Sequence, residues 1–248
     1  MRRIAVTAAV FLFAIEVWAG DPWKEKSYRD WSEKDVYKIL NDSPWAKRIE
    51  AERGSKKHDL EAPEGAPKVS GARGEDEEDE REEKERGGER EEEHKGKEKE
   101  ELKFVVRWVS SRTLREASVR GQILRKQISE ADADKSLPPA PADYELAVVG
   151  TDMTPFLSAS ESTLKSQTYL IAKKSKERIA ASQVEIVRGP DGKRINAIVF
   201  HFPRKNTADE AAVDAEEKEL KFVSRAGTIE IKVSFDPQKM VDKQGMDL

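Results

Sequence analysis

The chain has 248 residues, of which 38% are charged and 37% hydrophobic, and its formal net charge at pH 7 is −4. It contains no cysteine. This excludes disulfides, catalysis by a thiol, and zinc or iron–sulfur sites with cysteine ligands. The fold must therefore depend on its own hydrophobic core.

The first 19 residues have the three parts of a signal peptide. MRR is a basic start, IAVTAAVFLFAI is apolar, and VWA precedes a cleavage point after Ala19. The alternative is an uncleaved membrane anchor, but the apolar run is shorter than the roughly 20 residues that span a bilayer. We expect an exported protein, periplasmic or extracellular, with no stable membrane span after cleavage.

Residues 20–50 form a tryptophan-rich segment with a short helix. Ser32 and Asp35 have the spacing of a capping box, and Ser43-Pro44 should end the helix. A helix of about ten residues is marginal alone in water. We therefore expect the segment to dock into an apolar groove, either on its own C-terminal domain or on an envelope protein. The expected anchors are Trp31, Val36, Ile39, Leu40 and Trp45.

Residues 51–101 have the composition of a disordered, charged linker. The run from Glu75 to Glu101 holds 16 acidic and 7 basic residues, a net charge of −9, and no apolar side chain to bury. Such a run cannot bury enough surface to offset the entropy of folding. We expect the linker to connect the tryptophan-rich segment to a C-terminal domain.

Residues 102–248 have the pattern of an α+β domain. Alternating apolar residues predict strands at 102–108 and 143–153, and capped apolar stripes predict helices at 112–128 and 158–174. Turn residues between apolar runs predict hairpins at 181–205 and 218–235. The order β-α-β-α-β-β-β-β predicts a mixed, mostly antiparallel sheet with two helices on one face.

Few residues fit a catalytic arrangement. His58 and His94 lie in the charged linker, and His201 is a lone histidine on a strand. The motifs of serine hydrolases, P-loop proteins, zinc proteases and dinucleotide-binding proteins are absent. Asp152 at the end of a strand and Glu161 at a helix start could serve a carboxylate-dependent hydrolase, although both positions are also usual for turn and capping residues.

The sequence predicts no cofactor and no metal site. The acidic run EADAD at 130–134 lacks the glycine and the distal glutamate of an EF-hand loop. Basic residues at 173–178 could meet an anionic partner or the acidic run of the same chain. No aromatic residues that would stack on bases are interleaved with them, so we expect no nucleic acid partner.

Two stretches carry a resemblance to other proteins. They are the pattern W-x-x-x-D-x-x-x-I-L-N-x-S-P-W-A, from Trp31 to Ala46, and KELKFVSRAGTIEIKVSFDPQKMV at 218–241. Both ends of the chain are thereby similar to a group of bacterial secreted proteins to which no activity is assigned. The resemblance implies export and transfers no functional residue. We expect an exported, non-enzymatic binding or structural protein, with the carboxylate-dependent hydrolase as the alternative.

Overall fold

The computed structural model of the chain describes residues 20–52 and 101–248. The expected signal peptide and all but the ends of the expected linker lie outside the described residues. The described part has α+β architecture with antiparallel strands and short helices, which confirms the predicted class. It has more strands than the sequence pattern predicts, and they form two main sheets rather than one.

The larger sheet has five strands in the order β1-β2-β3-β7-β6, and each neighbouring pair is antiparallel. In β2, Leu102, Phe104, Val106 and Trp108 are buried, as the alternation predicts. The intervening residues of β2 lie on the outer face of the sheet. The strands are β1 (Ala46–Glu52), β2 (Glu101–Trp108), β3 (Tyr144–Gly150), β6 (Gln183–Arg188) and β7 (Ile195–Phe202).

The smaller sheet has the order β5-β4-β8-β9 and is also antiparallel. Both predicted hairpins are present, as β6–β7 and as β8–β9. The β8–β9 hairpin turns at Gly227, whose φ of +59° favours glycine. The strands are β4 (Thr168–Ala172), β5 (Arg178–Ala180), β8 (Leu220–Ala226) and β9 (Ile229–Phe235), and a further short pair is β10 (Val241–Asp242) with β11 (Gly245–Met246).

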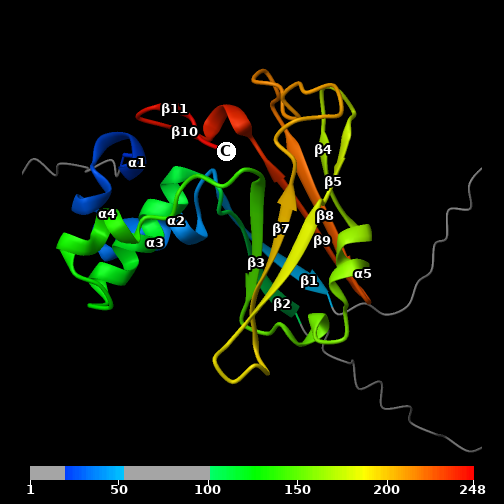
Figure 1. Ribbon diagram of the computed structural model, residues 1–248, viewed down its shortest axis with the longest axis horizontal. Helices are drawn as coiled ribbons and strands as arrows, with labels where there is room; N and C mark the ends of the chain where they lie inside the picture. Colours follow the sequence, from blue (N-terminus) through cyan, green and yellow to red (C-terminus); the bar gives the residue numbers. More distant parts are fainter. Residues whose placement is uncertain (1–19, 53–100) are drawn as a thin grey trace, which may run out of the picture.

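The helices lie on two sides of the strands: α1 to α4 gather on one side, and α5 lies on the other (Figure 1). α2 begins with the predicted capping box, in which Ser32 Oγ accepts from Asp35 N and Asp35 Oδ2 accepts from Ser32 N. Within the described ranges, no helix is long and apolar enough to cross a bilayer. The helices are α1 (Pro22–Glu25), α2 (Glu33–Asn41), α3 (Arg112–Leu124), α4 (Ala133–Ser136) and α5 (Glu161–Ser166).

The helix predicted over 158–174 is wrong in its second half. α5 ends at Ser166, and residues Thr168–Ala172 form β4, which pairs with β5 on one side and β8 on the other. A short apolar run satisfies a helical or a strand pattern equally well, and here strand pairing decides. The two predicted helices also do not share a face, because α3 packs against α2 whereas α5 packs against β6 and β8.

The sequence pattern does not predict β1. Its sequence, AKRIEAE, is mostly polar, and Ile49 is its only large apolar residue. The strand nevertheless pairs with β2 along its whole length, from Ala46 opposite Arg107 to Glu52 opposite Glu101. Residues 53–100 therefore join the ends of two paired strands of one sheet.

One hydrophobic core joins the tryptophan-rich segment to both sheets. Trp23 and Trp45 meet edge to face with ring centroids 5.5 Å apart. Trp108 of β2 meets Phe235 of β9 at the same centroid distance. Large aromatic side chains supply much of the buried apolar area, so the N-terminal segment contributes directly to the stability of the fold.

Candidate functional site

The expected anchor residues lie in the hydrophobic core of their own chain. Trp31, Val36, Ile39 and Trp45 are at most 5% exposed, and Leu40 packs against the core from its edge. The indole of Trp31 donates to the carbonyl oxygen of Pro22 at 3.1 Å. The four buried side chains therefore offer little surface to another molecule.

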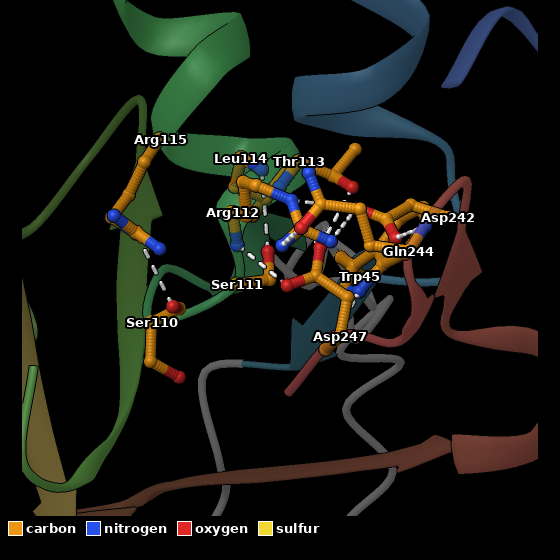
Figure 2. Close-up of polar contacts among 10 residues, drawn as sticks. All are labelled: Trp45, Ser110, Ser111, Arg112, Thr113, Leu114, Arg115, Asp242, Gln244 and Asp247. Carbon is orange, nitrogen blue, oxygen red and sulfur yellow. Dashed lines mark hydrogen bonds and ion pairs between the residues drawn. The ribbon is translucent and has the colours of Figure 1, made fainter. Parts of the chain in front are cut away.

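A polar cluster holds the first turn of α3 (Figure 2). The carboxylate of Asp247 accepts from the backbone N–H of Arg112 at 2.7 Å and of Thr113 at 2.9 Å, and from the hydroxyl of Thr113 at 2.7 Å. The guanidinium of Arg112 binds the carboxylate of Asp242. A negative charge at a helix N-terminus is favourable, so this cluster fixes the C-terminal residues on α3.

Glu116, on the next turn of α3, is a partly buried carboxyl group. Burial raises its pKa to about 7; the charges of Arg112 and Arg115 oppose the shift, and those of Asp242 and Asp247 add to it. Glu116 lines a cavity of about 210 Å³ beside Trp23. Small-molecule sites are usually about 300 Å³ or larger, so this cavity is a poor ligand site. No motif in the sequence distinguishes Glu116 from other helical glutamates.

The acids of the hydrolase alternative are not brought together in one cleft. Asp152 Oδ1 accepts from the backbone N–H of Thr154 at 2.8 Å, which is a turn-forming role. Glu161 is the first residue of α5, where Ser160 caps the helix by accepting from Thr163 N. Asp152 lines a surface cleft, and Glu161 is not among the residues that line this cleft.

The basic run at 173–178 is partly neutralised by acidic neighbours. Lys173 Nζ lies 2.6 Å from Glu219 Oε2. Lys174 Nζ lies 3.0 Å from Asp214 and 2.7 Å from Glu216. This stretch therefore presents less positive charge than its sequence indicates.

Three adjoining clefts cross the face formed by α2, α3 and the outer side of the larger sheet. The helix cleft, of about 860 Å³, lies between α2, α3 and a proline-rich loop at 138–141. The sheet cleft, of about 870 Å³, lies over β1, β2 and β3. The loop cleft, of about 710 Å³, lies between the segment after β3 and the start of β7.

Neighbouring clefts share lining residues, so we treat them together as the groove. The helix and sheet clefts meet at Tyr37, Asn41 and Arg107. The sheet and loop clefts meet at Gly150, Thr151 and Asn196. In Figure 1 the elements that carry the groove follow one another from α3, across β2 and β3, to the β6–β7 turn at the lower edge.

The groove is positively charged, although the chain as a whole is negative. Its lining residues include seven lysines and arginines but only four acids. The basic residues are Arg48, Lys103, Arg107, Arg115, Arg125, Lys193 and Arg194, and the acids are Glu33, Glu50, Glu145 and Asp152. The remaining lining is largely apolar, with valines on the sheet and prolines in the loop.

Arg107 lies where the helix and sheet clefts meet. Its Nε donates to the carbonyl oxygen of Leu40 at 2.7 Å, and its Nη2 donates to Asn41 Oδ1 at 3.0 Å. Burial lowers the pKa of Arg107. No carboxylate in the described ranges forms an ion pair with its guanidinium. A partly buried cation without a counter-charge is unfavourable, so an anionic group bound at this point would be stabilised.

Tyr37 lines the same two clefts as Arg107 and is 60% exposed. Arg48 Nη2 donates to the Tyr37 hydroxyl at 2.9 Å, and its guanidinium lies 5.4 Å from the centre of the Tyr37 ring. An exposed aromatic side chain held by an arginine is a typical contact residue of an interface. Tyr37 is on the helix that the sequence singles out, but its side chain is exposed, whereas the predicted anchors Val36 and Ile39 of the same helix are buried.

Glu145, one of the acids of the groove, has its Oε1 3.5 Å from Nδ1 of His201. In the part of the chain that the structure describes, no group of three or more histidine and acidic side chains could hold a metal ion.

A scan against protein-family models finds no match to the chain, and searches of curated proteins and of solved structures find no significant match. The geometry of the groove is therefore the basis for a functional assignment.

Proposed function

We propose that this chain is an exported, non-enzymatic binding protein whose groove holds an acidic segment of a partner polypeptide. The observation that carries the proposal is the partly buried Arg107, which has no carboxylate partner among the described residues and lies where two clefts of a basic groove adjoin. A carboxylate of the ligand would supply the missing counter-charge.

The composition of the groove favours an extended polypeptide as the ligand. Three consecutive clefts fit a chain better than a single compact molecule. Their apolar surfaces, such as Val105 and Val149 in the sheet cleft and Pro138 in the helix cleft, can contact the methylene groups of acidic side chains, whose carboxylates reach the basic residues.

Fluorescence anisotropy of fluorescein-labelled deca-glutamate, titrated with the full chain at low ionic strength, tests the proposal. We expect saturable binding that weakens as salt screens the charges. Arg107→Gln should weaken binding about ten-fold or more, because a hydrogen bond to a charged partner contributes about 1.5–3 kcal/mol. Arg188→Gln is the matched control, since Arg188 is an exposed arginine of β6 outside the groove lining.

Arg107 also contacts the C-terminal end of α2, so its loss could disturb the fold. The double variant Arg48→Gln, Lys103→Gln removes two charges at the rim without touching the core, and should weaken binding about three- to ten-fold. Equal affinities for the wild-type chain, this double variant and Arg188→Gln would refute the proposal. Tighter binding of a sulfated polysaccharide than of the peptide would show that the ligand class is wrong.

A further inference from the structure

The described residues on either side of the acidic segment lie beside the groove. Glu52 ends β1 and Glu101 begins β2, and these two residues are paired across the strands. Two residues further into each strand, Glu50 and Lys103 line the sheet cleft. The 48 residues from 53 to 100 therefore start and finish at the rim of the groove.

The charges of this segment and of the groove are opposite. The run from Glu75 to Glu101 has a net charge of −9. The groove has an excess of three positive charges among its lining residues. Arg107 in particular has no carboxylate partner within the described ranges. A polyacidic stretch covalently attached at the rim is thus a source of further carboxylates within the same molecule.

The segment is long enough to reach every part of the groove. Arg107 lies six residues along β2 from Glu101, a distance of about 20 Å at roughly 3.3 Å per residue. An extended chain of 48 residues spans up to about 160 Å, so a loop attached at both ends reaches up to about 80 Å. Attachment at both ends also keeps the acidic run at a high local concentration beside the groove.

We propose that the acidic run of residues 75–100 occupies the groove of its own chain and competes there with the external acidic polypeptide. This inference rests on the proposed function, because it assigns a second ligand to the same site. A partner must displace the intrachain ligand, so the observed affinity is lower than the intrinsic affinity of the groove.

The test uses the full-length chain with one set of substitutions in the acidic run. The variant E75Q, D76N, E77Q, E78Q, D79N, E80Q removes six negative charges and keeps the length of the chain. The matched control, E75D, D76E, E77D, E78D, D79E, E80D, exchanges the two acids and keeps every charge. All six positions lie outside the described fold, so neither set alters a described contact.

The first measurement is the backbone amide NMR spectrum at low salt. We expect the charge-removing variant to shift amides of Tyr37, Val105, Arg107 and Gly150 relative to the wild-type chain, and the charge-preserving control to leave them nearly unchanged. At about 1 M salt, where the screening length is about 3 Å, the spectra should converge. Identical groove amides in the wild-type chain and the charge-removing variant at low salt would overturn the inference.

The second measurement is the affinity for labelled deca-glutamate. We expect the charge-removing variant to bind about three-fold tighter or more than the wild-type chain and the charge-preserving control. Equal, measurable affinities of all three chains would overturn the inference and leave the proposed function standing. Absence of binding by all three chains would overturn both.

Discussion

The indole Nε1 of Trp45 donates to the carbonyl oxygen of Asp247 at 2.6 Å, across 202 positions of sequence. The carboxylate of the same Asp247 accepts the backbone N–H groups of Arg112 and Thr113 at the start of α3. One residue near the C-terminus thus joins the tryptophan-rich segment to the helix that forms one wall of the groove. The groove depends on this junction, since both α2 and α3 line it.

Asp247→Asn should lower the free energy of unfolding by about 1–3 kcal/mol. The substitution removes the negative charge at the start of α3 and turns one acceptor into a donor that faces backbone N–H groups. Urea denaturation monitored by tryptophan fluorescence measures the effect. Asp209→Asn is the control, because Asp209 is an exposed residue whose ion pair with Lys205 should contribute less than about 0.5 kcal/mol. Equal effects of the two substitutions would contradict the capping role.

Trp31→Ala should lower the free energy of unfolding by about 3–5 kcal/mol, because it removes a core side chain that is 2% exposed and leaves a cavity. Tyr37→Ala, on the exposed face of the neighbouring helix, should cost less than about 1 kcal/mol. The same two variants are also compared in the binding assay. Of the two, only Tyr37→Ala should weaken binding of the acidic peptide while the fold stays intact. A small stability effect of Trp31→Ala would show that the segment is not part of the core.

The start of α2 and the burial pattern of β2 follow from local sequence. Ser32 and Asp35 have the spacing of a capping box, and the capping box is present. Alternation in β2 correctly separates buried Phe104 and Val106 from outer residues such as Lys103. These features depend on neighbours within a few positions, which a single sequence displays directly.

The features that the sequence does not predict depend on distant neighbours. β1 is a strand because β2 supplies its hydrogen-bond partners, and β4 is a strand because β5 and β8 pair with it on both sides. Tyr37, Arg107 and Pro138 come from three separate parts of the chain and meet only in the fold. Nothing close to Arg107 in sequence indicates that its guanidinium lies at the end of α2 and has no ion-pair partner among residues 20–52 and 101–248.

Glu116→Gln should stabilise the protein at pH 8 by on the order of 1 kcal/mol. The pKa of Glu116 is raised from 4.5 to about 7 in the folded state, so the folded state favours the neutral carboxyl group. Stability should therefore fall as the pH rises from about 4.5 to about 7 and level off above that range. We expect a smaller change in the free energy of unfolding than the full pKa shift would imply, because the carboxyl group of Glu116 is partly accessible to water.

Unfolding in urea between pH 4 and pH 8 measures this effect. Glu116→Gln should lack the pH dependence of the free energy of unfolding that Glu116 contributes. The free energies of unfolding of the two proteins should converge near pH 4. Glu185→Gln, on the exposed edge strand β6, controls for the loss of one surface charge. A constant difference between wild type and Glu116→Gln across this range would contradict the raised pKa.

Gly150→Ala should cost about 1–3 kcal/mol of stability, because the added Cβ would lie 2.6 Å from the ring of Phe104 and 3.1 Å from the Lys103 carbonyl oxygen. Gly189→Ala is the matched control, since its Cβ would meet no atom closer than 3.4 Å. Thermal unfolding of both variants measures the difference. Melting of Gly150→Ala at the wild-type temperature would contradict the close packing of β2 against the end of β3. This packing lies where the sheet and loop clefts meet.

A map of where the acidic peptide binds tests most directly whether the groove is the binding site. Deca-glutamate is titrated into the uniformly ¹⁵N-labelled full chain at low salt, and backbone amide shifts are followed residue by residue. We expect the largest shifts at Tyr37, Asn41, Val105, Arg107 and Gly150, with little change on β5 and β9. Shifts concentrated at residues 173–178, or spread evenly over the exposed lysines and arginines, would contradict the assignment of the groove as the binding site.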